Sequence, residues 1–372
     1  MNEEIVLRIL AEQGIDLVAS LPCDKNKRLT TLLPTKFPVI DLAREEDGVG
    51  ICAGAYLGGR RPVVSIQSSG LGNMLNALMS LSRVYSLPLP ILASWRGVYH
   101  EAICAQVPFN EPLPRLLDVY EIPYRIFSTD EDLLHLDEVI AGAYEQKTPY
   151  VALMKPSCWE PQKPVEMAYP PREAQARTLT LPGYGKPEMK RLDAIRVVAD
   201  CADADTVLVS NIGVPSKELY ASRDRAGNFY MLGSYMQAAA IGLGCAVAMP
   251  DRRVVVIDGD GSLLGSAVLP VVAAAKCSNL TIVALDNGTF GSTGNQVSPA
   301  YATADLGFLA LAAGIDSVER ACSADDLRGA LERGTRFVHV LLSPGNSASP
   351  NILLSPDEIR DRFMRFCGEL ST

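Results

Sequence analysis

Short apolar runs rich in Val, Ile and Leu recur along the chain, separated by stretches whose apolar residues return at helical spacing. The runs do not alternate apolar with polar positions, which is typical of strands in a parallel sheet covered by helices on both faces. A last helix is predicted over 356–370. The predicted strands lie at 15–21, 39–43, 62–68, 89–95, 124–128 and 150–155, and at 206–210, 228–232, 254–258, 280–285, 317–321 and 337–342.

A proline-rich stretch separates the two series of strands. Between residues 156 and 187 prolines recur so often that no regular element is expected, and such a stretch fits an extended connector. We therefore predict an α/β protein with two doubly wound parallel-sheet domains. The predicted boundaries are 1–160 for the first domain, 161–187 for the connector and 188–372 for the second domain.

Composition narrows the classes of partner. The chain has 372 residues and a net charge of −9, which argues against nucleic acid or an anionic membrane, although a local basic pocket stays possible. No apolar run is long enough to span a membrane, and the acidic amino terminus is unlike a signal peptide. The nine cysteines are scattered without close pairs, so we expect free thiols in a reducing cytoplasm.

Two oxygen-bearing side chains follow neighbouring strands of the second half. Asp260 lies in the turn Gly259–Asp260–Gly261–Ser262 after strand 254–258, and Asn287 comes 27 residues later, after strand 280–285. Ligands bind at the carboxyl ends of parallel strands, and Asp and Asn oxygens suit Mg²⁺. The segment predicts a site for magnesium and phosphate; the alternative is an ordinary strand-turn-helix that carries Asp-Gly by chance.

Two turns of the first half also follow predicted strands. Glu45 and Glu46 begin a helix rich in Gly and Ala, where the helix dipole favours negative charge. Helix-end electrostatics alone is one explanation of this pair. The next turn opens another helix and points to a ligand. Its candidate residues are Ser69, Gly70, Gly72 and Asn73.

These segments resemble the thiamine-diphosphate-dependent decarboxylases and acetohydroxyacid synthases. The resemblance implies that Glu46, two residues before Gly48 and ten before Tyr56, hydrogen-bonds the aminopyrimidine of thiamine diphosphate and favours its imino tautomer. Glu45 is the alternative. Leu71 stands where the Gly-Pro-Gly turn of the family has proline.

The resemblance also implies how the second half binds the cofactor. Asp260, Asn287 and the backbone carbonyl of Thr289 would hold Mg²⁺. In the family a large apolar side chain holds the cofactor in a bent, V-shaped conformation. Tyr235 aligns with that side chain and Met236 is its neighbour; the alternative is that both pack in the core. Lys217 is a diphosphate candidate or a surface charge. The other expected contacts are Gly213 and Ser216 at a helix start, Gly233 and Ser234, and Gly259, Gly261 and Ser262.

The chain is too short for the third domain of the large family members. It is similar to the two-domain branch that acts on phosphonopyruvate and sulfopyruvate, with segments 21–25, 44–57, 66–73 and 92–97 matching the sulfopyruvate enzymes with their two subunits fused. The resemblance implies decarboxylation of 3-sulfopyruvate to sulfoacetaldehyde and CO₂ in coenzyme M biosynthesis. It also implies a homo-oligomer with the cofactor at the subunit interface. The alternatives are phosphonopyruvate as substrate, a carboligase, and a non-catalytic cofactor-binding protein.

A small anionic 2-oxo acid needs cationic and hydrogen-bonding partners. Lys25 and Arg96 lie in the most family-like segments, and Gln106 is a further candidate. Each could instead be structural or exposed. His100 is the histidine near these motifs; it would serve in proton transfer or lie on the surface. Lys27 and Arg28 are less favoured cations.

Overall fold

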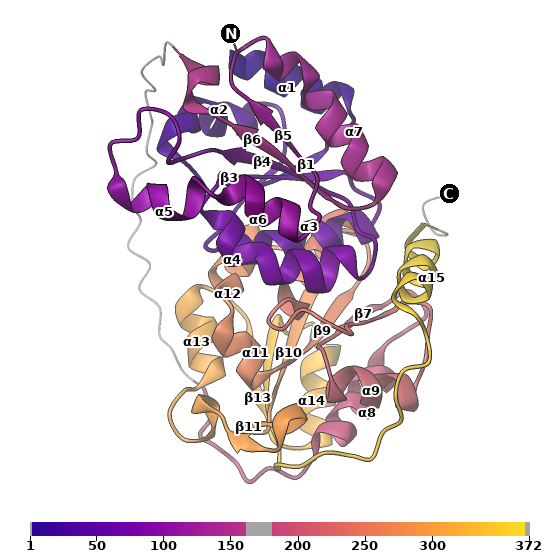
Figure 1. The fold of residues 1–372 in the computed structure, drawn as a ribbon. Coiled ribbons are helices and arrows are strands. Elements are labelled where there is room, and N and C mark those ends of the chain that lie inside the picture. Colours follow the sequence, from indigo (N-terminus) through magenta and orange to yellow (C-terminus); the bar gives the residue numbers. More distant parts are fainter. Residues whose placement is uncertain (1, 161–180, 369–372) are drawn as a thin grey trace. The chain divides into compact units, whose positions relative to one another are not determined.

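A computed structural model describes residues 2–160 and 181–368, which form two compact units (Figure 1). The first unit comprises Met1–Tyr56 and Arg60–Thr178, and the second comprises Leu57–Gly59 and Leu179–Thr372. Most of the predicted connector 161–187 lies outside the described residues, and its boundaries stay a prediction. Residues 181–187 form neither helix nor strand.

The first unit is built on a six-stranded parallel sheet in the order β2-β1-β3-β4-β6-β5. Each strand lies within two residues of its predicted span, because a wholly buried apolar run has little freedom to be anything else. Its strands are β1 (Leu17–Ser20), β2 (Val39–Asp41), β3 (Pro62–Gln67), β4 (Leu89–Ser94), β5 (Tyr124–Phe127) and β6 (Pro149–Met154).

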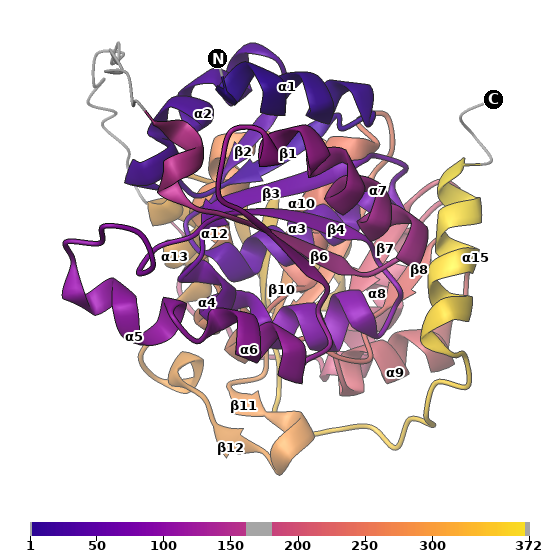
Figure 2. The same ribbon diagram turned by 45° about the horizontal axis from the view of Figure 1, so that its top comes forward.

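Helices cover both faces of this sheet (Figure 2). On one face lie α1 (Asn2–Glu12), α2 (Lys27–Leu32) and α7 (Leu136–Gln146), whose apolar residues form one core with Val18, Val63 and Leu92 of the strands. The opposite face carries α3 (Glu45–Leu57), α4 (Gly70–Ala77) and α6 (Leu113–Val119). The short helix α5 (Val107–Asn110) follows the loop after β4.

The second unit repeats this topology. Its sheet has the order β8-β7-β9-β10-β14-β13, the same succession as the first sheet, and all six strands are parallel. The fold class predicted from the sequence is therefore confirmed. The strands are β7 (Val207–Ser210), β8 (Asn228–Tyr230), β9 (Val254–Gly259), β10 (Leu280–Asp286), β13 (Val318–Ala321) and β14 (Phe337–Leu341).

The helices of the second unit form two neighbouring groups. One group is α8 (Arg191–Cys201), α9 (Val214–Ser222) and α14 (Ala324–Glu332); the other is α10 (Ala238–Ala248), α12 (Val268–Ala275) and α13 (Leu306–Ala313), with the short α11 (Asp260–Gly265) beside them. The last helix, α15 (Pro356–Gly368), packs against β8. No helix in either described range is long and apolar enough to cross a membrane.

One element was not predicted. A two-stranded antiparallel ladder, β11 (Thr289–Phe290) with β12 (Gln296–Val297), follows the magnesium motif. A strand of two residues is too short to show an alternating hydrophobic pattern, so this ladder could not be predicted from the sequence. All nine cysteines are free thiols, as expected.

The strand order also locates the ligand edges. In the first sheet β1 lies between β2 and β3: the chain forms β2 on one side of β1 and then crosses to form β3 on the other side. In the second sheet β7 lies between β8 and β9 in the same way. Ligands of doubly wound sheets bind outside the carboxyl ends of the strands at such a switch point. The predicted turns after β3 and β9 both lie there.

Candidate cofactor and substrate site

The second unit has a cavity of about 330 Å³ at the carboxyl ends of β7, β9 and β10. It brings together residues that lie up to 102 positions apart in the sequence, from Arg191 to Thr293, because parallel neighbouring strands end at one edge. Of the residues predicted to bind cofactor or metal, the cavity is lined by Gly213, Tyr235, Gly259, Asp260, Gly261, Ser262, Asn287 and Thr289.

Asp260 is the acidic side chain of this cavity. It is 4% exposed and accepts a hydrogen bond from the Ser298 hydroxyl. Burial raises the pKa of Asp260 to about 6; the Ser298 hydrogen bond opposes that rise, and the charge of Asp286 adds to it. A buried carboxylate with no basic partner is stabilised by a cation, so this environment fits a metal ligand.

The turn after β10 supplies the other expected ligands. The Asn287 side-chain oxygen accepts the Thr289 amide at 3.1 Å, and Asp286 accepts the Gly288 amide at 3.0 Å. Gly288 has φ +65°, a left-handed conformation that glycine adopts without a steric penalty. Within the described part of the chain, Asn287 Nδ2 and Thr289 Oγ1 are buried without a hydrogen-bond partner.

These groups fit a magnesium ion with a diphosphate. No cluster of three His, Cys, Asp or Glu side chains suited to a metal occurs in residues 2–160 or 181–368. Any metal here would therefore be held by one carboxylate with amide and backbone oxygens, and Mg²⁺ commonly uses one or two carboxylates plus phosphate and water. The orphaned Asn287 and Thr289 donors would find acceptors in a phosphate.

Two glycines keep the cavity open. Gly213 has φ +85°, and a methyl group added there would lie 2.6 Å from Ser292 Oγ. A methyl group on Gly261 would lie 2.3 Å from the Phe290 ring. A side chain at Gly261 would force the Phe290 ring to move, and one at Gly213 would be strained by its positive φ, so glycine is favoured at both positions.

Ser216, predicted to contact the diphosphate at the helix start, is not among the residues that line the cavity, and that contact stays a prediction. It is fully buried, donates to the backbone oxygens of Ser210 (3.0 Å) and Asn211 (2.8 Å), and accepts from the Met231 amide at 3.1 Å. Its side chain joins β7 to α9 instead. Lys217, the next residue, is half-buried outside the cavity lining.

The segment after β8 is conformationally strained. Ser234 (φ 68°) and Met236 (φ 74°) both adopt left-handed backbone, which costs about 1–2 kcal/mol for a residue with a side chain. Tyr235, held between them, lines the cavity, whereas Gly233, Ser234 and Met236 do not. Met236 packs against Gly265 of α11 instead. Of the two candidates for the side chain that bends the cofactor, Tyr235 is the one that faces the cavity.

In the first unit, Glu46 is buried at the start of α3. It is 4% exposed and pairs with the Arg44 guanidinium at 3.0 Å. Burial raises the pKa of Glu46, and the charge and hydrogen bond of Arg44 oppose the rise. Glu45 has another environment: it accepts a hydrogen bond from Asn73 at 2.9 Å and packs against Gly70, where a methyl group would lie 2.4 Å from its Cγ.

The turn after β3 belongs to a hydrogen-bonded cluster. Ser69 donates to Gln106 at 2.7 Å and accepts from Asn110 at 3.0 Å, while Gln67 donates to Ser69 at 3.1 Å and to Gln106 at 3.2 Å. A methyl group on Gly72 would lie 3.0 Å from the Phe109 ring. The predicted residues Ser69 and Gln106 are thus in direct contact.

Arg96 extends this cluster and is already paired. Its guanidinium makes a bidentate pair with Glu101 (2.7 and 2.8 Å) and reaches Asp24 at 2.5 Å and Gln67 at 3.3 Å. Arg96 is thus a buried, ion-paired cation, and its role in substrate binding stays a prediction. The pairing carboxylates lie 72 positions before and 5 after Arg96, and the sequence alone does not identify them as partners.

The remaining predicted cations lie toward the surface. Lys25 is 3.7 Å from Asp24, and Arg28 is 3.7 Å from Glu3. Lys27 and His100 are exposed. The ring of His100 lies edge-on to that of Tyr99, with 4.4 Å between centroids.

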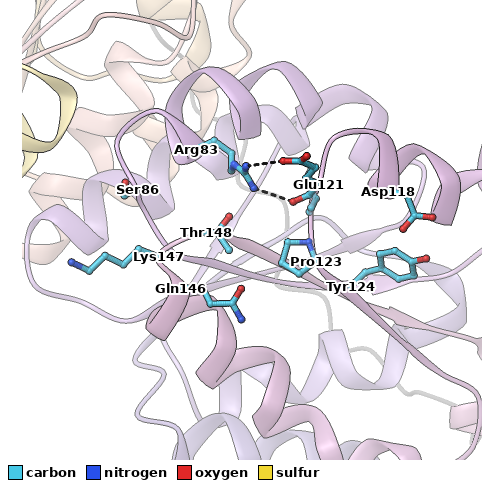
Figure 3. A pocket seen from close by; sticks show the side chains of 10 residues that line it. Arg83, Ser86, Asp118, Glu121, Pro123, Tyr124, Gln146, Lys147 and Thr148 are labelled. Carbon is cyan, nitrogen blue, oxygen red and sulfur yellow. Dashed lines mark hydrogen bonds and ion pairs between the residues drawn. The ribbon is translucent and has the colours of Figure 1, made fainter.

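A larger recess of about 720 Å³ lies elsewhere in the first unit (Figure 3). It is lined by residues just before β4, β5 and β6, including Pro123 and Thr148, and by Tyr124 at the start of β5, so it lies at the amino edge of the sheet. Its Arg83 pairs with Glu121 (Figure 3). None of the predicted site residues lines it, and the chemistry described above lies at the other edge.

Comparison with known proteins agrees with this geometry. Residues 2–118 match the family "Thiamine pyrophosphate enzyme, N-terminal TPP binding domain", and residues 217–341 match "Thiamine pyrophosphate enzyme, C-terminal TPP binding domain". A sulfopyruvate decarboxylase of Methanosarcina acetivorans is 46% identical over 97% of this chain and 96% of its own. The chain belongs to the thiamine-diphosphate-dependent decarboxylases.

Proteins less similar in sequence also match this chain over most of its length. A phosphonopyruvate decarboxylase of Streptomyces viridochromogenes is 32% identical over 95% of this chain and 91% of its own. The solved structure of a thiamine-diphosphate-dependent 4-hydroxybenzoylformate decarboxylase of Rhodococcus jostii superposes with a TM-score of 0.69 at 14% identity, covering 93% of this chain and 99% of that one. That likeness concerns the fold alone.

The structure adds candidate site residues that were not predicted from the sequence. Arg191 lines the cofactor cavity and is ion-paired with Glu218, 27 residues away. Ser298 contacts Asp260, and His339 lies 2.8 Å from Asp286, beside the Asn287 turn. None of these residues lies in a recognisable motif, and only the folded sheet brings them to the site.

Proposed function

We propose that this protein decarboxylates 3-sulfopyruvate to sulfoacetaldehyde and CO₂ in coenzyme M biosynthesis, using thiamine diphosphate and Mg²⁺. The observation that carries the chemistry is the Asp260 and Asn287 cavity at the switch point of the second sheet. The substrate rests on end-to-end similarity to a relative named for sulfopyruvate. We also infer a cytoplasmic location from the free thiols.

The second unit binds the diphosphate end of the cofactor. Asp260, the Asn287 side chain and the Thr289 carbonyl would hold Mg²⁺, whose charge would stabilise the diphosphate. Gly213, Gly259, Gly261 and Ser262 leave room for the diphosphate. When bound, thiamine diphosphate supplies the electron sink for carbanion chemistry, which no side chain of the protein can provide.

In the first unit, Glu46 takes part in proton transfer. A carboxyl whose pKa is raised by burial exchanges a proton more readily near neutral pH than an exposed one does. We assign it to the aminopyrimidine nitrogen. The charge and hydrogen bond of Arg44 limit the rise in the pKa of Glu46. We place Ser69, Gly70, Gly72 and Asn73 at the same cofactor end.

The substrate would be recognised by the cluster at the carboxyl edge of the first sheet. We propose that Arg96 keeps its buried partner Glu101 and exchanges its other partner, Asp24, for the substrate anion. Asp24 is 60% exposed, so it leaves the pair at little cost in desolvation. Lys25 and Gln106 add a charge and an amide donor, and His100 remains a candidate for proton transfer.

We propose a homodimer or larger assembly with the cofactor at the subunit interface, as the resemblance to the family implies. Size-exclusion chromatography with light scattering tests this: a fully active monomer would contradict it.

Product analysis tests the reaction itself. Purified protein is incubated with sulfopyruvate, phosphonopyruvate or pyruvate, with and without thiamine diphosphate and Mg²⁺, and CO₂ and aldehyde are measured. We expect sulfoacetaldehyde only with cofactor present. Faster turnover of phosphonopyruvate would transfer the assignment to the activity named for the 32% identical relative, and carbon–carbon bond formation with a second aldehyde would indicate a carboligase.

A further inference from the structure

The cavity of the second unit has a single basic side chain in its described lining, that of Arg191. Its other charged lining residue is Asp260. A diphosphate carries more negative charge than one Mg²⁺ neutralises, and Asp260 uses part of the charge of that ion. A second cation at the cavity would therefore contribute directly to cofactor affinity.

Arg191 is the first residue of α8 and is 6% exposed. Its Nε donates to Glu218 at 2.8 Å, and its Nη2 donates to Glu218 at 3.2 Å and to Asn346 at 2.9 Å. Among the described residues, Nη1 has no hydrogen-bond partner. A methyl group on Gly291, another lining residue, would lie 3.0 Å from Nη1, which places this nitrogen beside the cavity wall.

The guanidinium is held in place from two sides. Glu218 of α9 is 1% exposed and also accepts from the Ser347 hydroxyl at 2.8 Å. The Asn346 amide donates to the Gly291 backbone oxygen at 2.7 Å. Because an arginine fork fixed by a bidentate carboxylate has little freedom left, its remaining donors are oriented before any ligand arrives.

We propose that Arg191 is a cofactor-binding residue whose Nη1 donates to the diphosphate of thiamine diphosphate. The inference rests on the proposed function, which places the diphosphate in this cavity. Arg191 would act beside the magnesium ligands, with Glu218 and Asn346 as its positioning residues. The competing explanation is a purely structural ion pair between α8 and α9.

Binding measurements separate the two explanations. Isothermal titration calorimetry with thiamine diphosphate and with thiamine monophosphate, at fixed Mg²⁺, is run on the full chain. Arg191→Met alone leaves Glu218 buried and unpaired and threatens the fold. The decisive protein is therefore Arg191→Met/Glu218→Gln, which removes both charges and keeps similar volumes. Arg196→Met is the matched control, because Arg196 lies on the same helix with its side chain 59% exposed.

We expect the double variant to unfold at a similar urea concentration to the unmodified protein, and to bind thiamine diphosphate roughly 10- to 100-fold more weakly, the range for one charge-assisted hydrogen bond. Its preference for diphosphate over monophosphate should shrink, and Arg196→Met should change neither quantity. Unchanged affinity in a folded double variant would overturn the inference and leave the proposed function intact. Failure of the unmodified protein to bind the cofactor would overturn both.

Discussion

The pairing of Arg96 with Glu101 leads to a quantitative prediction for Glu101→Gln. Glu101 has a side chain 5% exposed; it accepts both forks of the Arg96 guanidinium, and it also accepts the backbone amides of Gly97 (3.2 Å) and Ile103 (3.1 Å). One carboxylate therefore closes the loop between β4 and α5. Glutamine keeps the shape but removes the charge and replaces one acceptor by a donor facing Arg96.

The pKa of Glu101 sets the size of the effect. The Arg96 hydrogen bonds, with the Ile103 and Gly97 amides, lower this pKa from 4.5 to about 2 against the opposing effect of burial. At about 1.4 kcal/mol per pKa unit, the full shift corresponds to about 3 kcal/mol. The loop lies near solvent, which screens the pair, so we expect a loss of about 1–2 kcal/mol for Glu101→Gln.

The sign of the pH dependence follows from linkage. A carboxyl whose pKa is lower in the folded state stabilises the fold above its unfolded pKa and loses that contribution as pH falls through the folded value. The stability difference between the unmodified protein and Glu101→Gln should thus be greatest above about pH 5. It should shrink as pH falls toward about 2, the pKa of Glu101 in the folded state, where half of this carboxyl is protonated.

Tryptophan fluorescence reports this change selectively, because both tryptophans of the chain, Trp95 and Trp159, lie in the first unit. Urea unfolding followed by this signal at pH 6 and pH 3 gives the two differences. Glu138→Gln is the control: Glu138 is 55% exposed and pairs with Arg125 at the surface, where such pairs contribute at most about 1 kcal/mol. The same destabilisation at both pH values, or one no larger than in Glu138→Gln, would refute the reasoning.

Three further predictions concern the proposed reaction. Asp260→Asn should weaken Mg²⁺-dependent cofactor binding at least ~10-fold by calorimetry, since a charged metal ligand is lost; unchanged affinity would remove Asp260 from the metal site. Glu46→Gln should lower kcat roughly 10²-fold or more while magnesium diphosphate still binds; a mild Glu46→Gln beside a damaging Glu45→Gln would exchange their roles. Asp24→Asn should lower KM for sulfopyruvate and Arg96→Ala should reduce kcat/KM roughly 10- to 100-fold, more for sulfopyruvate than for pyruvate; equal losses on both substrates would make Arg96 structural.

The sequence predicted the fold well because its strands are buried on both faces. An apolar run such as 280–285 has one stable position in a covered parallel sheet, and β10 is found at Leu280–Asp286. The turns that carry Asp260 and Asn287 were readable for the same reason, since a strand end fixes the edge on which the next residues lie. The ladder of β11 and β12 was not readable, because pairing over two residues leaves no pattern.

The ion-pair partners of the arginines at the two candidate sites could not be predicted from the sequence. Arg96 lies in a segment that resembles the family and Arg191 does not. Each is nevertheless buried and ion-paired, Arg96 with Glu101 and Arg191 with Glu218. Whether a charge is available to a ligand depends on such partners, which here are Glu101 of the same loop and Asp24 for Arg96, and Glu218 of another helix for Arg191. Ser216 illustrates the same point for a hydroxyl, which satisfies backbone groups of β7 rather than facing the cavity.

The shared topology of the two units shows how different chemistry arises at equivalent places. The fourth strand along the chain in each unit is β4 in the first and β10 in the second. Arg96 follows β4, and Asn287 follows β10. The third strand, β3 or β9, leads to Ser69 or to Asp260. The second unit thus presents oxygen ligands suited to a hard cation, whereas the first presents a guanidinium, amides and a hydroxyl suited to an organic anion. Because the two sheets share one strand order, the proposed division between metal diphosphate and substrate would depend on the few side chains at these strand ends. Exchanging a partner of one of them, as in Asp24→Asn, is the direct way to test that proposal in one unit without changing the other.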